Sequence, residues 1–136
     1  LANRRRVEAM EAYISDAIEH GAELNTGGNR IGNAGNFFEP TVMSNVPITA
    51  RAMNEEPFGP LALVNSVTGL ASALEEANRL DYGLAAYGFT RSASQSAKLA
   101  AGIRSGMVSI NHYGLALPEV PFGGIGDSGN GTEGGA

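Results

Sequence analysis

The chain has 136 residues, a length that fits one domain with a single hydrophobic core. Its net charge is −5, and its nine lysines and arginines are scattered except for the run Arg4-Arg5-Arg6. This argues against nucleic-acid binding, which needs a concentrated basic face. Because the sequence has no cysteine, disulfides, thiolate metal sites and a cysteine nucleophile are excluded within it. Two separated histidines cannot form a zinc site unaided, so we expect no metal.

Neither membrane insertion nor export is indicated by the sequence. No apolar run approaches the roughly 20 residues that span a bilayer, and the first residues lack the charged-then-apolar pattern of a signal peptide. We therefore expect no membrane association and a cytoplasmic location. The chain starts with Leu1 rather than methionine, and the end of its glycine-rich tail (126–136) neither caps a helix nor completes a strand. The sequence predicts a piece of a larger protein.

Apolar residues near the N-terminus predict an amphipathic helix. They recur at the three-and-four spacing of a buried helical stripe and are Val7, Met10, Tyr13, Ile14, Ala17 and Ile18. Asn3 is placed to cap the start of this helix, and Gly21 is placed to end it. Residues 23–26 are predicted to form a short strand, and the glycine–asparagine turns of 27–36 indicate a loop or hairpin.

Prolines and apolar runs define the rest of the chain. Residues 41–46 are predicted to form a strand and 48–54 at most a short helical turn, because prolines interrupt this section. From Leu61 onward, short apolar runs alternate with helices of about ten residues; the runs are 61–67, 84–89 and 107–110, and the helices are 70–77 and 94–103. This order is typical of βαβ units. We predict an α/β fold with a mainly parallel sheet and flanking helices.

The domain organisation is predicted to be simple. No internal repeat and no low-complexity linker precedes the tail, so residues 1–136 are expected to form a single partial domain. Gly83 and Gly106 lie where helices turn into strands, and we expect them to relieve left-handed bends there.

Several motifs then follow one another in a recognisable order. They are Asn54-Glu55-Glu56-Pro57-Phe58-Gly59-Pro60, Tyr82-Gly83-Leu84-Ala85-Ala86, Gly106-Met107-Val108-Ser109-Ile110-Asn111, Pro121-Phe122-Gly123-Gly124 and Asp127-Ser128-Gly129. In this order they resemble the C-terminal part of the catalytic domain of the NAD(P)-dependent aldehyde dehydrogenases, over nearly the whole chain. The resemblance implies NAD or NADP as cofactor, a small-molecule aldehyde as substrate and a homo-oligomer as the complete enzyme.

The acidic turn is the segment that the resemblance assigns to the cofactor. A carboxylate can accept hydrogen bonds from both hydroxyls of a ribose, and such bonds are about twice as strong as those between neutral groups. In the family motif the second acid binds the nicotinamide ribose and the phenylalanine packs against the nicotinamide. The resemblance therefore implies that Glu56 and Phe58 bind the cofactor, in a turn that Pro57 should stiffen. Glu55 is assigned no function and is expected to face elsewhere or to bind the backbone.

The resemblance also places the substrate. In the family, the aromatic residue of the Pro-Phe-Gly-Gly loop lines the aldehyde tunnel, which implies substrate contact by Phe122. The preceding segment 112–120 corresponds to the loop that shapes aldehyde preference, and its sequence resembles that of succinate-semialdehyde dehydrogenases. A dicarboxylic semialdehyde needs a cation for its distal carboxylate, but Arg91 and Arg104 are more simply explained as surface residues. The family commonly has lysine where Gly126 stands.

The catalytic groups are the parts that this sequence does not contain. The resemblance implies that the cysteine nucleophile, the glutamate base, the asparagine donor and the main cofactor domain lie upstream of Leu1, so this chain has no catalytic residue of its own. We expect a fragment of an aldehyde dehydrogenase that is inactive alone. Two alternatives stay open: a non-catalytic α/β module that associates through its sheet edges, and a relative whose catalytic site has decayed.

Overall fold

The computed structural model of the chain describes residues 1–135. Contacts within it divide the chain into two compact units, Leu1–Ser66 and Val67–Ala136. Each unit contains helix and strand, which confirms the α/β class. The expectation of one partial domain over 1–136 stays a prediction.

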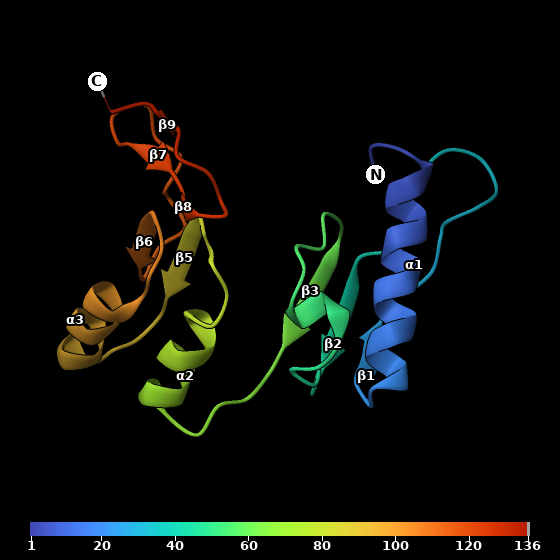
Figure 1. The fold of residues 1–136 in the computed structure, drawn as a ribbon, viewed down its shortest axis with the longest axis horizontal. Helices are drawn as coiled ribbons and strands as arrows, with labels where there is room; N and C mark the ends of the chain where they lie inside the picture. Colours follow the sequence, from blue (N-terminus) through green and yellow to red (C-terminus); the bar gives the residue numbers. More distant parts are fainter. Residues whose placement is uncertain (136) are drawn as a thin grey trace. The chain divides into compact units, whose positions relative to one another are not determined.

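The first unit packs one long helix on a three-stranded sheet (Figure 1). Helix α1 (Arg4–Glu19) is followed by β1 (Glu23–Thr26), β2 (Thr41–Ser44), the 3-10 turn η1 (Arg51–Met53) and β3 (Leu61–Val64). The strand order is β1-β2-β3; β1 runs antiparallel to β2, and β3 runs parallel to it. These elements match the predicted helix, strands and helical turn.

Helix α1 begins and ends at the predicted residues. The Asn3 side chain accepts a hydrogen bond of 3.2 Å from the Arg6 N–H, and Gly21 leaves the helix with a φ of +98°, which suits glycine. The predicted stripe is buried except at one position, because Ile18 lies at the margin of the stripe and is 46% exposed. The stripe therefore ends at Ala17.

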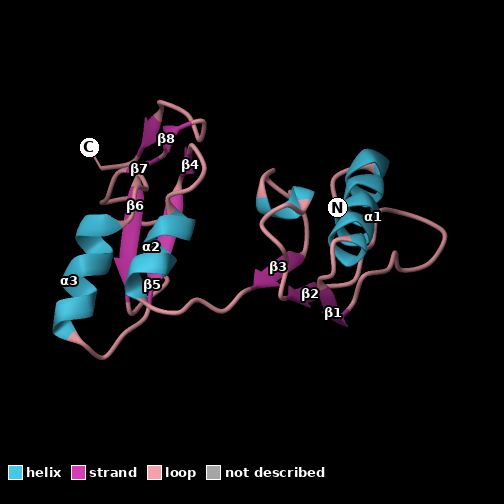
Figure 2. Cartoon of the chain, turned by 60° about the horizontal axis from the view of Figure 1, so that its bottom comes forward, coloured by secondary structure: helices cyan, strands magenta, loops and turns pink. Residues whose placement is uncertain are grey.

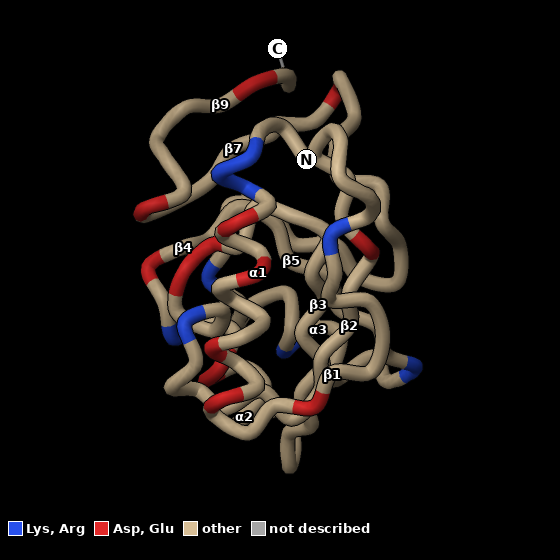
Figure 3. The backbone as a smooth tube through the Cα atoms, turned by 90° about the vertical axis from the view of Figure 1, so that its right-hand side faces the viewer, with Lys and Arg blue, Asp and Glu red and all other residues tan. Residues whose placement is uncertain are grey.

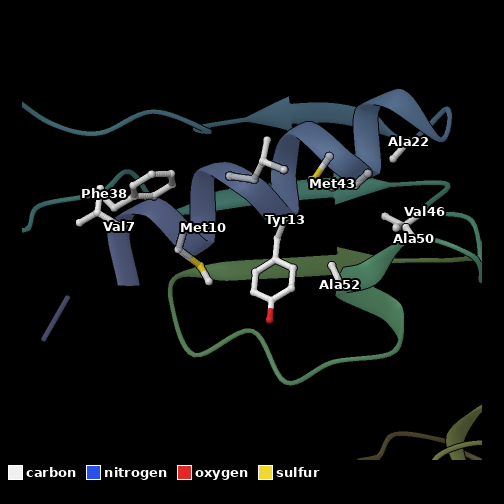
Figure 4. Close-up of a cluster of buried hydrophobic side chains, with 11 residues drawn as sticks. Val7, Met10, Tyr13, Ala22, Phe38, Met43, Val46, Ala50 and Ala52 are labelled. Atoms are coloured by element: carbon white, nitrogen blue, oxygen red, sulfur yellow. The ribbon is translucent and has the colours of Figure 1, made fainter. Parts of the chain in front are cut away.

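The core of the first unit lies between α1 and the sheet (Figure 4). Met10 of α1 and Met43 of β2 are fully buried at its centre, as expected of methionines that fill irregular apolar space. Phe38 packs near the helix start, and the Tyr13 ring extends from α1 with its hydroxyl toward the segment between η1 and β3. This core holds the acidic turn against α1.

The second unit contains two helices and several short strand pairs (Figure 2). Its elements are α2 (Leu70–Ala77), β4 (Tyr82–Gly83), β5 (Ala85–Gly88), α3 (Ala93–Gly102), β6 (Met107–Ile110), β7 (Phe122–Gly123), β8 (Ile125–Gly126) and β9 (Thr132–Glu133). Strands β5 and β6 are parallel with α3 between them in sequence, which is the predicted βαβ unit. The pairs β4–β8 and β7–β9 are antiparallel.

The sheets are small and mixed, so the prediction of a mainly parallel sheet needs correction. Two strand pairs, β2–β3 and β5–β6, are parallel, and three are antiparallel. The antiparallel pairs arise because β1 turns back onto β2 and because the glycine-rich segment folds back onto β4 and onto itself. Only one of the two parallel pairs, β5–β6, is connected by an α-helix.

Gly83 and Gly106 serve close backbone approach rather than the predicted left-handed bends. Neither Gly83 nor Gly106 has a positive φ, which contradicts that expectation. A side chain at Gly106 would meet the carbonyl oxygen of Gly123 in β7. Gly126 has a φ of +57°, and a side chain there would meet the carbonyl oxygen of Asp81. The glycine in place of the family's common lysine therefore fits the backbone that surrounds it.

Charges are interspersed along the chain (Figure 3). In α1 the basic residues of the first turn are followed by acidic residues, and Arg4 pairs with Glu8 at 2.9 Å. None of the helices within residues 1–135 combines the length and the apolar character needed to cross a bilayer.

Candidate functional site

The acidic turn presents Glu56 and Phe58 at the surface of the first unit. Phe58 is 62% exposed, and the Arg6 guanidinium of α1 lies 5.2 Å from its ring centroid, a cation–π distance. The Glu56 side chain is exposed, and within residues 1–135 no hydrogen bond or ion pair engages its carboxylate. Both residues predicted to bind the cofactor are therefore accessible, and an acid and an aromatic ring stand two positions apart.

The end of this turn is held by backbone bonds and by tight packing on α1. The Gly59 N–H donates to the Pro57 carbonyl at 2.9 Å, and the Leu61 N–H donates to the Gly59 carbonyl at 2.8 Å. The Thr41 N–H donates to the Pro60 carbonyl at 2.8 Å, which joins the turn to the start of β2. A side chain at Gly59 would meet the buried Met10 sulfur, so a larger residue there would displace the Met10 side chain.

Glu55 is held by two side chains, whereas a backbone contact or an outward-facing side chain was predicted. Its carboxylate accepts a hydrogen bond of 2.8 Å from the Tyr13 hydroxyl and bonds of 3.0 and 3.1 Å from the Arg51 guanidinium. Arg51 also lies 5.1 Å from the Tyr13 ring centroid. These bonds, from Arg51 first and Tyr13 second, hold the pKa of Glu55 below its ordinary value. Burial, followed by the bond to Glu55, raises the pKa of Tyr13.

Sequence reasoning missed this group, although two signals pointed to it. Arg51 and Glu55 have the i,i+4 spacing at which opposite charges meet on one helical turn. Tyr13 lies on the buried stripe of α1, where a phenol hydroxyl needs a partner. What the sequence does not show is that α1 and the turn, 42 residues apart, meet at this point.

In the second unit Phe122 is half-buried in β7 and lines a cavity of about 300 Å³. The other lining residues are Ala116, Leu117, Pro118, Glu133 and Gly134. The structure thus brings the predicted substrate residue together with the predicted substrate loop. A side chain at Gly123, the residue after Phe122, would meet the Gly131 carbonyl oxygen at 2.6 Å, so β7 is closely packed behind the ring.

A second cavity of about 470 Å³ lies on the other part of that loop. Apolar residues such as Met107, Leu115 and Leu117 line it together with His112. The Gly114 N–H donates to His112 Nδ1 at 3.1 Å, so the neutral ring carries its proton on Nε2 and can donate from there. No arginine or lysine is among the described residues that line either cavity.

Each unit thus carries one feature of the kind found at small-molecule sites: an accessible acid close to an aromatic ring in the first unit, and an apolar cavity lined by Phe122 in the second. The groups that would perform a covalent reaction are not among them, since the sequence has no cysteine. No group of three metal-binding side chains occurs in residues 1–135.

Comparison with known proteins identifies the family. The aldehyde dehydrogenase family matches residues 1–136. The mitochondrial succinate-semialdehyde dehydrogenase of Rattus norvegicus is 40% identical over 98% of this chain and 26% of that protein. The succinate-semialdehyde dehydrogenase [NADP(+)] of Escherichia coli K12 is 38% identical over 98% of this chain and 28% of that protein. The crystal structure of succinate-semialdehyde dehydrogenase from Burkholderia pseudomallei has a TM-score of 0.93 at 38% identity, over 99% of this chain and 28% of that one.

The chain belongs to the aldehyde dehydrogenase family. It spans 26–28% of the length of the relatives named above. The resemblance inferred from the sequence motifs is confirmed by these matches.

Proposed function

We propose that this chain is part of an NAD(P)-dependent aldehyde dehydrogenase, in which it supplies the nicotinamide-ribose clamp and part of the substrate tunnel. By ribose clamp we mean Glu56 and Phe58. The observation that carries the proposal is the turn that presents both residues, with an unpartnered carboxylate and an exposed ring, in a chain that the family matches from end to end. The complete enzyme would oxidise an aldehyde to a carboxylic acid and transfer a hydride to the cofactor.

The two clamp residues would act on different parts of the cofactor. The Glu56 carboxylate would accept hydrogen bonds from the ribose hydroxyls, which fixes the sugar next to the nicotinamide. The Phe58 ring would restrict how the nicotinamide ring lies, because flat rings pack in a few offset or edge-on arrangements. When bound, the cofactor accepts the hydride; the role of these residues is to orient it.

Phe122 would form part of the wall of the substrate tunnel. It lines an apolar cavity with residues of the loop that corresponds to the family's specificity loop. All three proteins named above are called succinate-semialdehyde dehydrogenases. The described lining of the two cavities includes His112 but no arginine or lysine, so for a substrate of this class a permanent cation for the distal carboxylate would have to come from elsewhere in the complete enzyme.

The clamp is tested by substitution in the complete enzyme. Glu56→Gln removes the charge but keeps the size, and we expect the KM for NAD or NADP to rise about tenfold, because charge-assisted hydrogen bonds are worth about 1.5–3 kcal/mol. Steady-state kinetics at saturating aldehyde measures this. The control is Glu75→Gln, which removes another exposed carboxylate, and which should leave this KM unchanged. An unchanged KM in Glu56→Gln would contradict the clamp.

A second function, association through a sheet edge, is favoured by the aromatic surface of the second unit. Tyr87 and Phe89, two positions apart at the end of β5, each pack at a tilt against Tyr113, with centroid distances of 5.6 and 5.0 Å. All three rings are exposed. Within the described residues, β5 and β6 form a two-stranded sheet, and a strand without a neighbour on one side can pair with another chain. The same surface could serve the homo-oligomer that we propose for the complete enzyme.

A further inference from the structure

Helix α1 contacts the acidic turn at three successive levels. Arg6 lies over the ring of Phe58, Met10 packs against Gly59, and Tyr13 donates its hydroxyl hydrogen to Glu55. Residues three or four apart lie on one face of a helix, so these three side chains form one row along α1. The turn that carries the ribose clamp therefore lies along a single face of this helix.

The contact at Glu55 is the one with the most defined geometry. Arg51 bonds the carboxylate through two nitrogens, at 3.0 and 3.1 Å, and this two-point arrangement fixes the plane of the carboxylate as well as its position. The Tyr13 hydroxyl bonds the same group from α1 at 2.8 Å. Tyr13 itself is 7% exposed and is part of the buried core, so its hydroxyl is a fixed point.

Arg51 is itself held from α1 and from the chain that follows it. Its backbone N–H donates to Asp16 Oδ2 at 2.8 Å, and its guanidinium lies over the Tyr13 ring. Its carbonyl oxygen accepts a bond of 2.9 Å from the Glu55 N–H. Both the backbone and the side chain of Glu55 are thereby tied to residues anchored on α1.

Glu56 follows directly after this fixed residue, and its own carboxylate has no partner within residues 1–135. Pro57 then restricts the backbone on the other side, since its ring fixes φ. The freedom that Glu56 retains lies mainly in its side chain. Fixing a neighbouring residue is an effective way to aim a ligand-binding group, because small displacements of such groups reduce activity strongly.

We propose that Glu55 is a positioning residue: bound to Tyr13 and Arg51, it fixes the turn that presents Glu56 and Phe58 to the cofactor. This inference rests on the proposed function, because it concerns the same clamp. Glu55 does not touch the cofactor in this proposal. It acts through the backbone that it shares with Glu56.

The experiment compares four variants of the complete enzyme. Tyr13→Phe removes one hydroxyl, and Glu55→Gln keeps the size of the side chain but removes its charge. We expect each substitution to raise the KM for NAD or NADP about fivefold. The kcat at saturating cofactor should change less than about twofold, because the contacts of Glu55 affect cofactor placement rather than the reactive groups. In the double variant Tyr13→Phe/Glu55→Gln the KM should be no higher than in Glu55→Gln, since both changes break one contact.

The matched control is Glu8→Gln on the same helix. It breaks an exposed ion pair of similar length, Arg4 with Glu8 at 2.9 Å, which does not reach the turn. Its KM should equal that of the unsubstituted enzyme. A second measurement, ¹³C NMR titration of labelled tyrosine in this chain, should show that Glu55→Gln lowers the pKa of Tyr13 part of the way to its ordinary value, whereas Glu8→Gln does not.

The outcomes distinguish the positioning role of Glu55 from the clamp role of Glu56 and Phe58. If Glu56→Gln raises the cofactor KM but Glu55→Gln and Tyr13→Phe do not, the positioning role is wrong and the clamp stands. If Glu56→Gln has no effect, the clamp is wrong and the positioning role is overturned with it. If Tyr13→Phe does not fold, Glu55→Gln decides alone. A Tyr13 pKa that does not respond to Glu55→Gln also overturns the inference.

Discussion

At the scale of single residues, the glycines of the second unit determine how closely its backbone segments approach. The ordinary φ of Gly106 would accept any residue, but the Gly123 carbonyl oxygen occupies the position that a side chain would take. Gly106 precedes β6, and Gly123 follows the predicted substrate residue Phe122 in β7. The absence of one side chain thus permits the packing behind the cavity wall.

We predict that Gly106→Ala lowers the free energy of unfolding by about 2 kcal/mol, because the added methyl group forces two backbone segments apart. Urea unfolding followed by circular dichroism measures this. Gly131→Ala is the control, since that position has open space around it and no positive φ, and its effect should stay within about 0.5 kcal/mol. Equal effects of the two substitutions would contradict the proposed close approach.

Glu55 makes the stability of the first unit depend on pH. Arg51 and Tyr13 hold its pKa below the ordinary value of 4.5, so the stabilisation is present above pH 4.5 and is lost as the pH falls through the lowered pKa. We predict that Glu55→Gln lowers the urea midpoint at pH 7 and that this difference is smaller at pH 3. The carboxylate is half exposed, so solvent screening keeps the difference small. Glu75→Gln should change the midpoint equally at both pH values.

At the scale of elements, α1 is the structural centre of the first unit. It contributes Met10, Tyr13 and three further residues to the core, and the same face carries the side chains that contact the acidic turn. The burial of α1 and the position of the turn therefore depend on the same packing.

We predict that Met10→Ala lowers the free energy of unfolding by about 3 kcal/mol, because it leaves a cavity at the centre of the core. Ile18→Ala on the same helix is the control and should cost less than about 1 kcal/mol, since Ile18 is largely outside the core. Thermal unfolding by differential scanning calorimetry provides the comparison. A cost at Met10 no greater than at Ile18 would show that the helix is not packed as described.

The elements that sequence patterns predicted are those with strong local signals. Helix α1 was given by its apolar stripe and its Asn3 cap, and the β5–α3–β6 unit by apolar runs separated by a helix. Strands β4, β7, β8 and β9 were not predicted, because two-residue pairings have no periodicity and depend on contacts such as Gly83 N–H with Ser128, 45 residues apart. Local pattern also could not distinguish mixed from parallel pairing.

The site residues likewise divide into those that the sequence could indicate and those that depend on contacts between distant segments. Glu56, Phe58 and Phe122 were assigned by resemblance to a family; an acidic turn before a strand does not by itself indicate a cofactor. The contact of Tyr13 with Glu55 could not be predicted, because it requires knowing which face of α1 the turn packs on.

At the scale of the whole molecule, the composition limits what this chain can do alone. Without cysteine it has no thiolate to attack an aldehyde, and the two residues proposed as the clamp cannot alone offset the freedom that a dinucleotide loses on binding. We predict that the purified chain forms no NADH or NADPH from succinic semialdehyde or another aldehyde, measured by absorbance at saturating cofactor. Reduced cofactor formed by material of the correct intact mass would contradict this.

The purified chain also allows a test of whether it is a fragment of an aldehyde dehydrogenase or a stand-alone α/β module that associates through its sheet edges. Gel filtration with intact-mass measurement should show aggregation if the exposed apolar residues are normally covered by the rest of an enzyme. A monodisperse folded species would favour the module instead.

The neighbouring positions of Glu55 and Glu56 imply that the exposed segment between η1 and β3 tolerates changes of length poorly. Arg51 reaches the carboxylate four residues further along, and the next acid is the one left unpaired. Deleting a single residue between Arg51 and Glu55 would place Glu56 at the guanidinium and leave no unpaired acid after it. An insertion at the same place would separate Arg51 from Glu55. Homologous chains should therefore vary in length in the loop over 27–36 far more readily than in these few positions, although both lie at the surface.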